Sequence, residues 1–519
     1  MLQQLSRLFN FLEKERMNFI VIFFWVSIIS ALRAYVEAYL FNYSYKELTY
    51  SNIFTYAHII SFFICAFLGI ILIIKVLTKE KLLKMANLFS IGFLIILTPP
   101  LIDNYFFRER TYTYIPKNKF IYAFTFQYHK IFPSVAGYGL MIEILLLLIF
   151  TSIYIYVKTN SIKKTILNIF LLNTFLSIIS TPKLNPLLEK WSLGDLCQPA
   201  FFLYFLIICT ILFHLIILSA GKKLFYSFLL SSGHLRSFHF ILMGIIGIIV
   251  ARNVDINLFK IWEYKYSGNF GIIGITLFSL FFLWQFAVWI NHIYDVSIDK
   301  FSKYKRALPA TLMDEKVAKE LAIIYAIISL FLAFTLGKIQ FILAIICIFL
   351  GIVYSCPPFR LRNYVFAPSI IGLGSALSYL FAYFSPNYIA TKYYIERIYP
   401  SLTHEALIFF FIILIAISIG SMVKDIDDYE GDLRAGVKNI FTIYGLERGL
   451  KISSILLFLS FLTPLLLFNE IYDFIACIVT ASLTVLLLNK IKKYWAIFPF
   501  YFILLFYIVV RWLQVFTSP

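Results

Sequence analysis

Two clusters of carboxylates stand at the ends of long apolar segments and are the residues most able to do chemistry. In the first cluster an amide and two acids recur at every fourth position, as Asn291, Asp295 and Asp299. Because four residues advance an α-helix by about 400°, these side chains lie on one helical face. They follow an apolar run, 270–290, that is long enough to cross a bilayer. Carboxylates at the mouth of a membrane helix are costly and usually functional.

A second acidic cluster follows another apolar run, 407–423. Asp425, Asp428 and Asp432 are spaced i, i+3 and i+7, which again indicates one helical face. On the same helix Asp427 is expected to point away from that face. Either cluster alone is compatible with a solvated helix end or a capping array. Two clusters of like charge, each just past an apolar run, need a counter-charge that metal ions supply.

Oxygen ligands of this kind are typical of Mg²⁺, which often shares them with the phosphates of a substrate. We therefore predict a magnesium site whose ligands come from both clusters. Basic side chains near the clusters are candidates to bind phosphate oxygens, arginine in bidentate fashion. These candidates are Arg306, Arg360, Lys424 and Arg362. Each is also compatible with a role as a cytoplasmic anchor for its helix.

These motifs resemble those of the UbiA superfamily of intramembrane prenyltransferases. The patterns N-x-x-x-D-x-x-x-D at 291–299 and D-x-x-D-x-x-x-D at 425–432 look like its two Asp-rich motifs. Lys-Arg-Ala-Leu-Pro at 305–309 resembles its basic segment after the first motif. Tyr-Ser-Cys-Pro-Pro-Phe-Arg-Leu-Arg at 354–362 and Glu-Gly-Asp-Leu-Arg-Ala-Gly-Val-Lys at 430–438 resemble two further segments, in the same order.

The resemblance covers roughly residues 230–519 and departs from the family pattern at Ala307 and Met313. It implies helices around a central cavity that opens to lipid, capped by three inner loops at 291–318, 355–365 and 424–450. It also implies that all six motif residues are catalytic Mg²⁺ ligands. The expected reaction moves a prenyl group from a polyprenyl diphosphate to a hydrophobic or aromatic acceptor and releases diphosphate.

Other functions are compatible with the same residues. A terpene cyclase would ionise the same diphosphate without an acceptor. A membrane transporter or lipid-binding protein could use the acids to bind a coupling cation, although transporters tend to place charges near the membrane midplane in repeated segments. Acceptors compatible with the resemblance include quinone precursors, porphyrin-type rings, glycerol phosphates and sugar phosphates.

Composition identifies an all-α, polytopic membrane protein, because 61% of the residues are hydrophobic and only 14% are charged. About fifteen apolar runs have the length of membrane spans. Six fall in an N-terminal module, 1–229, and nine in a prenyltransferase-like domain, 230–519. The expected spans are 17–40, 54–77, 85–103, 136–157, 164–181, 200–220, 236–255, 270–290, 319–336, 340–355, 366–384, 406–423, 451–468, 471–488 and 495–514.

The net charge of +18 follows membrane topology, so we expect no nucleic-acid partner. Most Lys and Arg residues fall in alternate loops, and the positive-inside rule makes those loops cytoplasmic. We therefore expect the N-terminus and both acidic loops inside, the C-terminus outside, and the chain in the cell membrane.

The N-terminal module shows no catalytic constellation, and we expect it to have a structural role or to bind a protein partner. Arg33 and Glu143 lie within its spans, where ionisable residues are costly, and we expect them to form an ion pair. Six cysteines without a CxxC pattern are expected to be packed free thiols.

Overall fold

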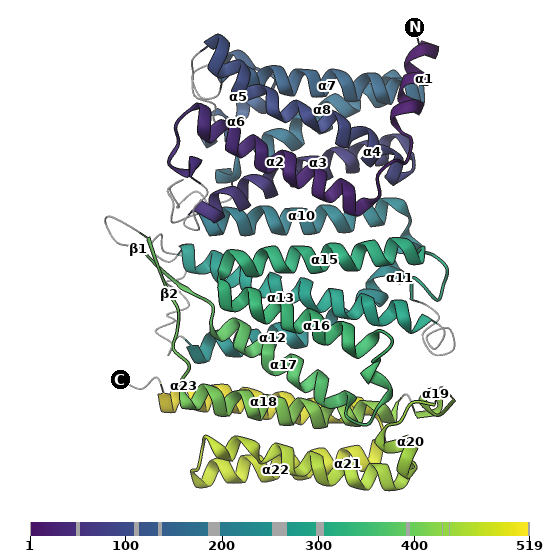
Figure 1. Ribbon diagram of the computed structural model, residues 1–519, viewed down its shortest axis with the longest axis vertical. Coiled ribbons are helices and arrows are strands. Elements are labelled where there is room, and N and C mark those ends of the chain that lie inside the picture. Colours follow the sequence, from purple (N-terminus) through teal and green to yellow (C-terminus); the bar gives the residue numbers. More distant parts are fainter. Residues whose placement is uncertain are drawn as a thin grey trace. The chain divides into compact units, whose positions relative to one another are not determined.

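The computed structural model describes residues 2–47, 52–107, 114–132, 137–184, 198–251, 267–296, 306–390, 395–427, 429–434 and 436–516. The described residues are helical apart from turns and one short two-stranded sheet of β1 (Asn387–Ala390) and β2 (Ile395–Ile398). The predicted all-α class is confirmed (Figure 1). The chain forms two compact units. The first comprises Met1–Tyr226, Ile261–Gly271 and Ile389–Glu396, and the second Ser227–Lys260, Ile272–Tyr388 and Arg397–Pro519.

The first unit is a bundle of apolar helices around α3. Its helices are α1 (Leu2–Leu12), α2 (Phe19–Leu40), α3 (Ile53–Thr78), α4 (Leu82–Gly92), α5 (Thr98–Ile102), α6 (Phe120–Phe124), α7 (Tyr138–Thr159), α8 (Ile162–Ile179) and α10 (Gln198–Ala220), with 3₁₀ turns η1 (Ser44–Lys46), η3 (Phe93–Leu97), η5 (Lys117–Lys119), η6 (Tyr128–Lys130) and η7 (Pro182–Leu184) and a π turn, η4 (Asp103–Phe107). The central helix α3 packs against α10, α2 and α8.

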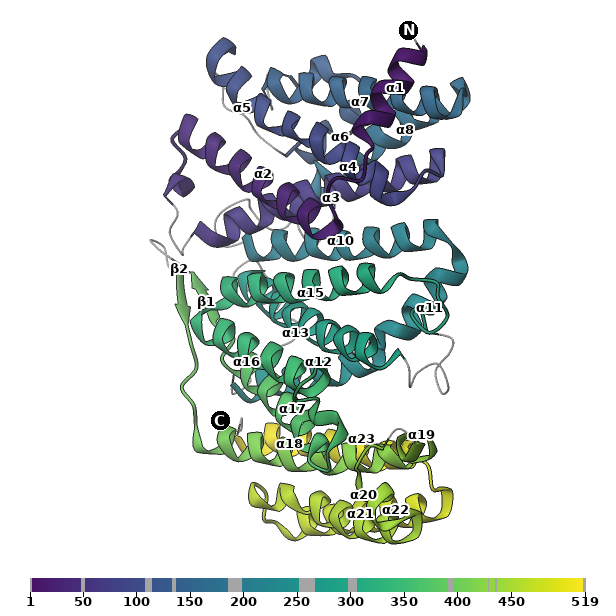
Figure 2. The ribbon, with the colours of Figure 1, turned by 45° about the vertical axis from the view of Figure 1, so that its right-hand side comes forward.

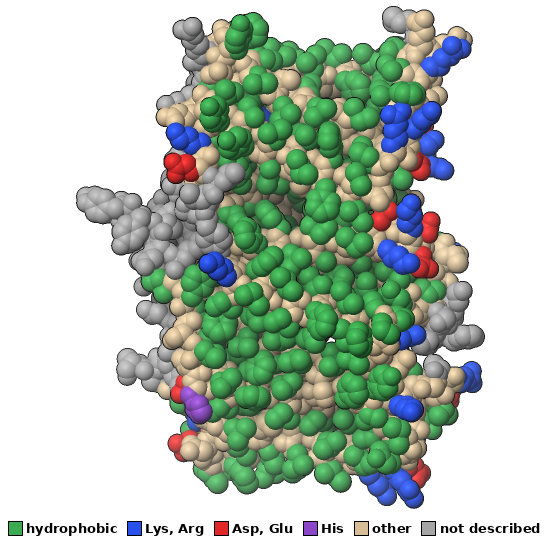
Figure 3. All heavy atoms as spheres, viewed as in Figure 1, with side chains coloured by type: hydrophobic (Ala, Val, Ile, Leu, Met, Phe, Trp, Pro, Cys, Tyr) green, Lys and Arg blue, Asp and Glu red, His purple; other side chains and the backbone are tan. Residues whose placement is uncertain are grey.

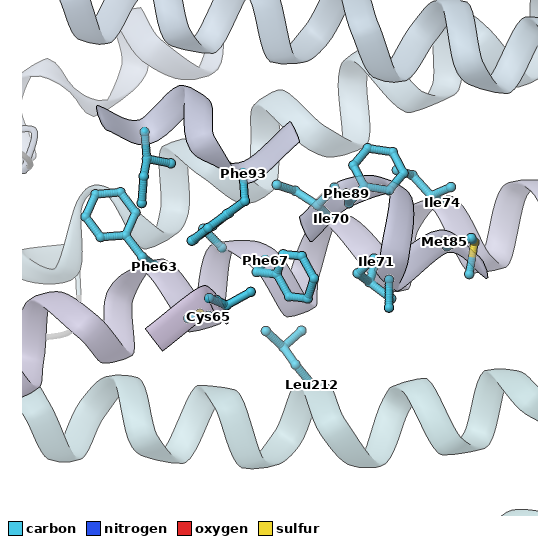
Figure 4. Packing of buried hydrophobic residues seen from close by; sticks show 14 of the residues in the cluster. Phe63, Cys65, Phe67, Ile70, Ile71, Ile74, Met85, Phe89, Phe93 and Leu212 are labelled. Carbon is cyan, nitrogen blue, oxygen red and sulfur yellow. The ribbon is translucent and has the colours of Figure 1, made fainter. Parts of the chain in front are cut away.

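The core of this unit is built from aromatic and aliphatic side chains that belong to several helices. Phe67 of α3, Phe89 of α4 and Phe93 of η3 are buried together with Leu212 of α10, as Figure 4 shows. Asn18 begins α2 by accepting a hydrogen bond from the backbone N–H of Val21 at 2.9 Å. Such a cap satisfies one of the free amides at a helix start.

A polar cluster closes one end of the first unit. Lys158 at the end of α7 lies 2.7 Å from Glu13, which follows α1, and 3.7 Å from Glu80 between α3 and α4. The hydroxyl of Tyr154 donates to the other oxygen of Glu13 at 2.7 Å. Three loops that the charge pattern assigns to one side of the membrane therefore meet at one end of the bundle.

The second unit contains the segments that carry the acidic motifs. Its helices are α12 (His234–Ala251), α15 (Glu315–Leu336), α16 (Lys338–Ser355), α17 (Ala367–Tyr383), α18 (His404–Val423), α19 (Tyr429–Arg434), α20 (Ile440–Tyr444), α21 (Leu446–Phe461), α22 (Ile471–Ile491) and α23 (Phe498–Phe516), with 3₁₀ turns η11 (Leu361–Asn363), η12 (Lys424–Ile426), η13 (Thr463–Leu466) and η14 (Tyr494–Ile497). Two further helices, α11 (Lys222–Ser232) and α13 (Ser267–Tyr294), pass from one unit into the other along the chain.

Within the second unit α17 packs against both α12 and α18, and α21 packs against α18 and α22. Figures 1 and 2 both show α19 at the opposite end of the helices from the C-terminus. The acidic loop after α18 and the end of α23 therefore lie at opposite ends of this unit.

The expected membrane spans agree with the helices. Thirteen helices of the described residues have the length and hydropathy to cross a bilayer. A pair bent by 48°, Lys222–Ser232 with Ser237–Ala251, and the shorter apolar helix Ala367–Tyr383 account for the other two expected spans. Hydrophobic side chains cover the middle of the helices in Figure 3, while Lys and Arg gather toward their ends. Exposed side chains such as Phe506 and Leu486 fit a lipid environment.

Candidate active site

A cavity of about 620 Å³ lies inside the second unit. Its body is apolar and aromatic, with Phe240 of α12, Trp284 of α13 and Phe409 of α18 among its lining residues. One group of lining residues is polar, and all but the amide Asn291 are charged: Asn291, Asp295, Arg306, Arg362, Lys424 and Asp427. A volume of this size is ordinary for a binding site, and an apolar pocket with a few convergent polar groups is typical of one.

The first motif forms the last turn of α13. The backbone N–H of Asp295 donates to the carbonyl of Asn291 at 3.0 Å, so the helical ladder continues through the motif. The amide Nδ2 of Asn291 donates to Oδ2 of Asp295 at 2.6 Å. The i, i+4 spacing therefore places both side chains together on the cavity, as predicted. Asp299 lies outside the described residues.

Two arginines compensate the buried charge of Asp295. The guanidinium Nη2 of Arg360 lies 3.2 Å from Oδ1 of Asp295 and donates to the carbonyl of Tyr294 at 3.2 Å. Arg362 forms an ion pair with Oδ2 of the same carboxylate and also lines the cavity. The Asp295 side chain is only 3% exposed, and a buried carboxylate requires such partners.

The second motif is not one continuous helix. The α-helix α18 ends at Val423, Lys424–Ile426 form a 3₁₀ turn, and α19 begins at Tyr429. Residues i and i+3 eclipse each other in a 3₁₀ turn, so Lys424 and Asp427 face the same way. Both line the cavity. Asp427, which was expected to point away from the face shared by the other acids, therefore lies on the cavity side, because the lining face of α18 runs through Ser421 and Lys424 to Asp427 and not to Asp425.

The other acids of the second motif differ in their surroundings. Asp425 is not among the residues that line the cavity. Asp432 is buried and accepts a hydrogen bond from Nδ2 of Asn439 at 2.9 Å. Asn439 in turn caps α20 through the backbone N–H groups of Phe441 and Thr442. Asp432 thus holds the start of α20 in place. Asp428 lies outside the described residues.

The family resemblance implied that three loops cap the cavity, and contacts among the described residues connect these loops. Arg360 joins the loop after α16 to the end of α13 through Asp295. The backbone N–H of Lys438 donates to the carbonyl of Asn363 at 3.0 Å, which joins the loop after α18 to η11. The backbone N–H of Ala307 donates to Oγ of Ser231 at 2.8 Å. This backbone contact holds Ala307 of the first loop against α11.

The donor chemistry of the site fits a hard cation. Asp295, Asp427 and Asn291 offer carboxylate and amide oxygens to one cavity, and Mg²⁺ prefers oxygen ligands. Among the described ranges, no three His, Cys, Asp or Glu side chains are grouped as a complete metal site. Mg²⁺ often needs only one or two carboxylates because water and substrate phosphate complete its shell.

Several lining residues were not predicted from the sequence. His239 of α12 faces the cavity, and its Nε2 lies 3.3 Å from Oγ of Ser375. Trp284 stacks on Phe240 and donates from Nε1 to Ser378 at 2.9 Å. Ser355 lines the cavity with a buried Oγ. A lone histidine or tryptophan in an apolar run carries no periodic signal, although Ser355 belongs to a segment that resembled the family.

Comparisons with known proteins add a family relationship to this geometry. The model of the UbiA prenyltransferase family matches residues 260–507. The chain is 30% identical over 204 residues to the digeranylgeranylglyceryl phosphate synthase of Saccharolobus solfataricus, which covers 38% of this chain and 67% of that protein. It is 26% identical over 207 residues to a probable homogentisate phytyltransferase of Oryza sativa, which covers 40% of this chain and 52% of that protein. The chain therefore spans about two thirds or less of the length of these relatives.

Solved structures of similar description also match. A structure of digeranylgeranylglyceryl phosphate synthase in membranes is 21% identical with a TM-score of 0.42, covering 57% of this chain and 99% of that one. A UbiA homologue from Archaeoglobus fulgidus bound to DMAPP and Mg²⁺ is 17% identical with a TM-score of 0.40, covering 54% of this chain and 99% of that one.

Proposed function

The chain belongs to the UbiA prenyltransferase family, as its motifs predicted, and we propose that its second unit is a Mg²⁺-dependent membrane prenyltransferase. The proposed donor is a polyprenyl diphosphate, and the acceptor is a hydrophobic molecule in the same membrane. The observation that carries this proposal is the cavity itself, which combines an acidic and basic group of residues with an apolar, aromatic body.

The charged residues suit the departure of a diphosphate. When the bond between C1 of the prenyl chain and oxygen breaks, its electron pair stays on the diphosphate, whose negative charge must be stabilised. Arg306, Arg362 and Lys424 line the cavity and offer N–H donors to phosphate oxygens. Arg360 touches Asp295 and is proposed to position it. Mg²⁺, when bound, would stabilise the leaving group as a Lewis acid.

We propose that Asn291, Asp295 and Asp427 supply Mg²⁺ ligands from the described residues. Asp299 and Asp428 stay predicted ligands. Asp425 stays a predicted ligand as well, although it is not among the lining residues. For Asp432 the hydrogen bond to Asn439 favours a positioning role over direct ligation.

The apolar body suits the prenyl cation and its chain. Trp284, Phe240 and Tyr501 line this part of the cavity, and aromatic faces attract cations while excluding water. The new bond forms when a nucleophilic atom of the acceptor attacks C1, and the acceptor loses a proton if the product is neutral. His239 and Ser355 are among the lining groups able to hold that proton or orient the acceptor.

The class of acceptor can be tested with compounds suggested by the names of the similar proteins. We propose a panel of homogentisate and geranylgeranylglyceryl phosphate, with geranylgeranyl diphosphate as donor and the purified full chain in lipid vesicles. Diphosphate release that needs one acceptor supports a transferase. Release without any acceptor would instead favour a terpene cyclase. No release with donor and Mg²⁺ over the whole panel would contradict the proposal.

We also propose that the acidic loops face the cytoplasm and that the chain lies in the cell membrane. The concentration of Lys and Arg in the loops beside both motifs supports this orientation. A protein partner for the N-terminal module stays a prediction.

A further inference from the structure

A second cavity, of about 430 Å³, lies within the first unit. Its walls come from α2, α3, α4, η3, α7 and α8 and are almost entirely apolar. Phe63, Phe67 and Phe93, labelled in Figure 4, are among the lining residues. A well-packed core leaves few voids larger than a water molecule, so a space of this size is suited to a ligand.

Two ionisable side chains interrupt the apolar lining, beside one serine, Ser180. Arg33 of α2 and Glu143 of α7 both line the cavity. The expected ion pair between them is wrong, because Arg33 instead donates from Nη1 to Glu37 at 2.5 Å, one turn along the same helix. The Arg33 side chain is 2% exposed, and its Nε has no hydrogen-bond partner. Oε2 of Glu143 is likewise buried without a partner.

These two atoms have complementary hydrogen-bonding roles. The Nε–H group of Arg33 is a donor without an acceptor, and Oε2 of Glu143 is an acceptor without a donor. Buried polar atoms in proteins are nearly always satisfied, and a ligand is one source of the missing partners. A hydroxyl group both accepts and donates, so one hydroxyl can serve both atoms.

The local charge selects against an anionic head group. The single positive charge of Arg33 is already compensated by Glu37. A third acid, Asp103, is buried and accepts from the backbone N–H of Gly139 at 2.6 Å, near the start of α7. With Glu143, the acids outnumber the one arginine, and a phosphate or carboxylate would meet net repulsion.

We propose that the first unit binds a long-chain lipid alcohol in this cavity, with the hydroxyl between Arg33 and Glu143 and the chain among the phenylalanines. This site is separate from the charged cavity of the second unit and does not depend on the prenyl-transfer proposal. It gives the N-terminal module a ligand of its own.

The test uses the purified full chain and hexadecanol that carries a diazirine. Photolabelling should map to lining residues such as Phe67, Phe93 and Leu147. Unlabelled hexadecanol should compete, whereas hexadecane and hexadecyl methyl ether should compete about tenfold more weakly or worse, because each leaves a buried polar atom unpaired. Palmitate should also compete poorly because of its charge. Equal competition by hexadecane, or labels spread outside the cavity, would overturn the proposal.

A substitution at Gly92 can test the site by filling the cavity with a larger side chain. Gly92 lines the cavity with an ordinary helical φ of −62°, and a Cβ added there meets no atom within 4 Å. Gly92→Leu should therefore keep the fold, fill the space and lower labelling about tenfold. Leu145→Ala is the matched control, since Leu145 is exposed on α7 and does not line the cavity. Unchanged labelling of a folded Gly92→Leu protein would refute the site.

A second variant tests how the cavity recognises the hydroxyl group. It keeps the proposal testable even if Gly92→Leu does not fold. Glu143→Gln keeps the shape but replaces one carboxylate oxygen by an amide. It should reduce the preference for hexadecanol over its methyl ether about tenfold. An unchanged preference would contradict the role of Glu143, whatever Gly92→Leu does. Diphosphate release by the second unit, measured in parallel, reports separately on prenyl transfer.

Discussion

Asp295 and Arg360 lie 65 positions apart, yet Nη2 of Arg360 is 3.2 Å from Oδ1 of Asp295. Arg362 pairs with the other carboxylate oxygen, which also accepts from Asn291. The carboxylate is 3% exposed, and three neighbours from two segments offset the cost of burying it. This cluster connects the first acidic motif to the loop after α16.

Asp295→Asn should nearly abolish diphosphate release. Loss of one preorganised charge at a reacting centre typically costs on the order of 3 kcal/mol of barrier, or roughly 100-fold in rate. The matched control is Glu315→Gln, since Glu315 is an exposed acid at the start of α15 that pairs only with the exposed Lys319 in the described contacts. Rates close to wild type for Asp295→Asn in a folded protein would contradict the proposed site.

Metal dependence gives the same site a second readout. EDTA should stop release, and Mg²⁺ should restore it. Asp295→Asn should also raise the Mg²⁺ concentration that gives half of its residual rate, since one oxygen ligand is weakened. A residual rate with the wild-type Mg²⁺ dependence would mean that Asp295 acts only by holding the arginines.

Asp427→Asn should lower diphosphate release more than Asp425→Asn. Asp427 lines the cavity, whereas Asp425 is not among the lining residues. The comparison is matched in chemistry, and both positions flank the same short 3₁₀ turn. If Asp425→Asn were the more damaging change, the result would favour Asp425 over Asp427 as the acid that acts in the site.

Removal of Arg33 or Glu37 alone should destabilise the first unit more than removal of both. The two side chains are 2% and 6% exposed, and a buried charge left without its partner typically costs about 3–5 kcal/mol. Arg33→Met and Glu37→Met should each lower the melting temperature in detergent, and the double variant should recover part of that loss. Additive losses would show that the pair does not act as a unit.

Cysteine labelling in intact cells should follow the proposed topology. Lys438 is exposed in the loop after the second motif, and Leu402 is exposed before α18, at the other end of that helix. An impermeant maleimide should label Leu402→Cys and should not label Lys438→Cys until the membrane is opened. The reverse result would invert the orientation and place the acidic motifs outside.

The native cysteines can also react with the maleimide, and their reaction depends on pH. Cys65, Cys347 and Cys477 are buried. Cys356 is the partly buried thiol beside the site, and burial raises its pKa. Because the thiolate is the reactive form, labelling of Cys356 in opened membranes should stay slow at neutral pH and rise only above the pH at which an exposed thiol reacts. Equal pH profiles for Cys356 and an exposed introduced cysteine would contradict the effect of burial.

The sequence by itself determined the elements and the first motif. All fifteen expected spans correspond to apolar helices, because length and hydropathy are properties of a contiguous segment. Asn291 and Asp295 share one face because the i, i+4 relation is fixed by the backbone hydrogen bonds of a single helix. The family resemblance rested on the same local patterns and on their order.

Only the tertiary structure decided which side chains meet. Asp427 lies on the cavity because the lining face of α18 continues through Lys424 to it, and spacing alone does not reveal which face of a helix meets a cavity. Arg33 pairs with Glu37 and not with Glu143, although Arg33 and Glu143 both line the smaller cavity, and His239 and Trp284 line the larger one. These outcomes depend on how each helix is rotated against its neighbours. That rotation is set by the packing of whole surfaces, to which residues far apart in the sequence contribute together.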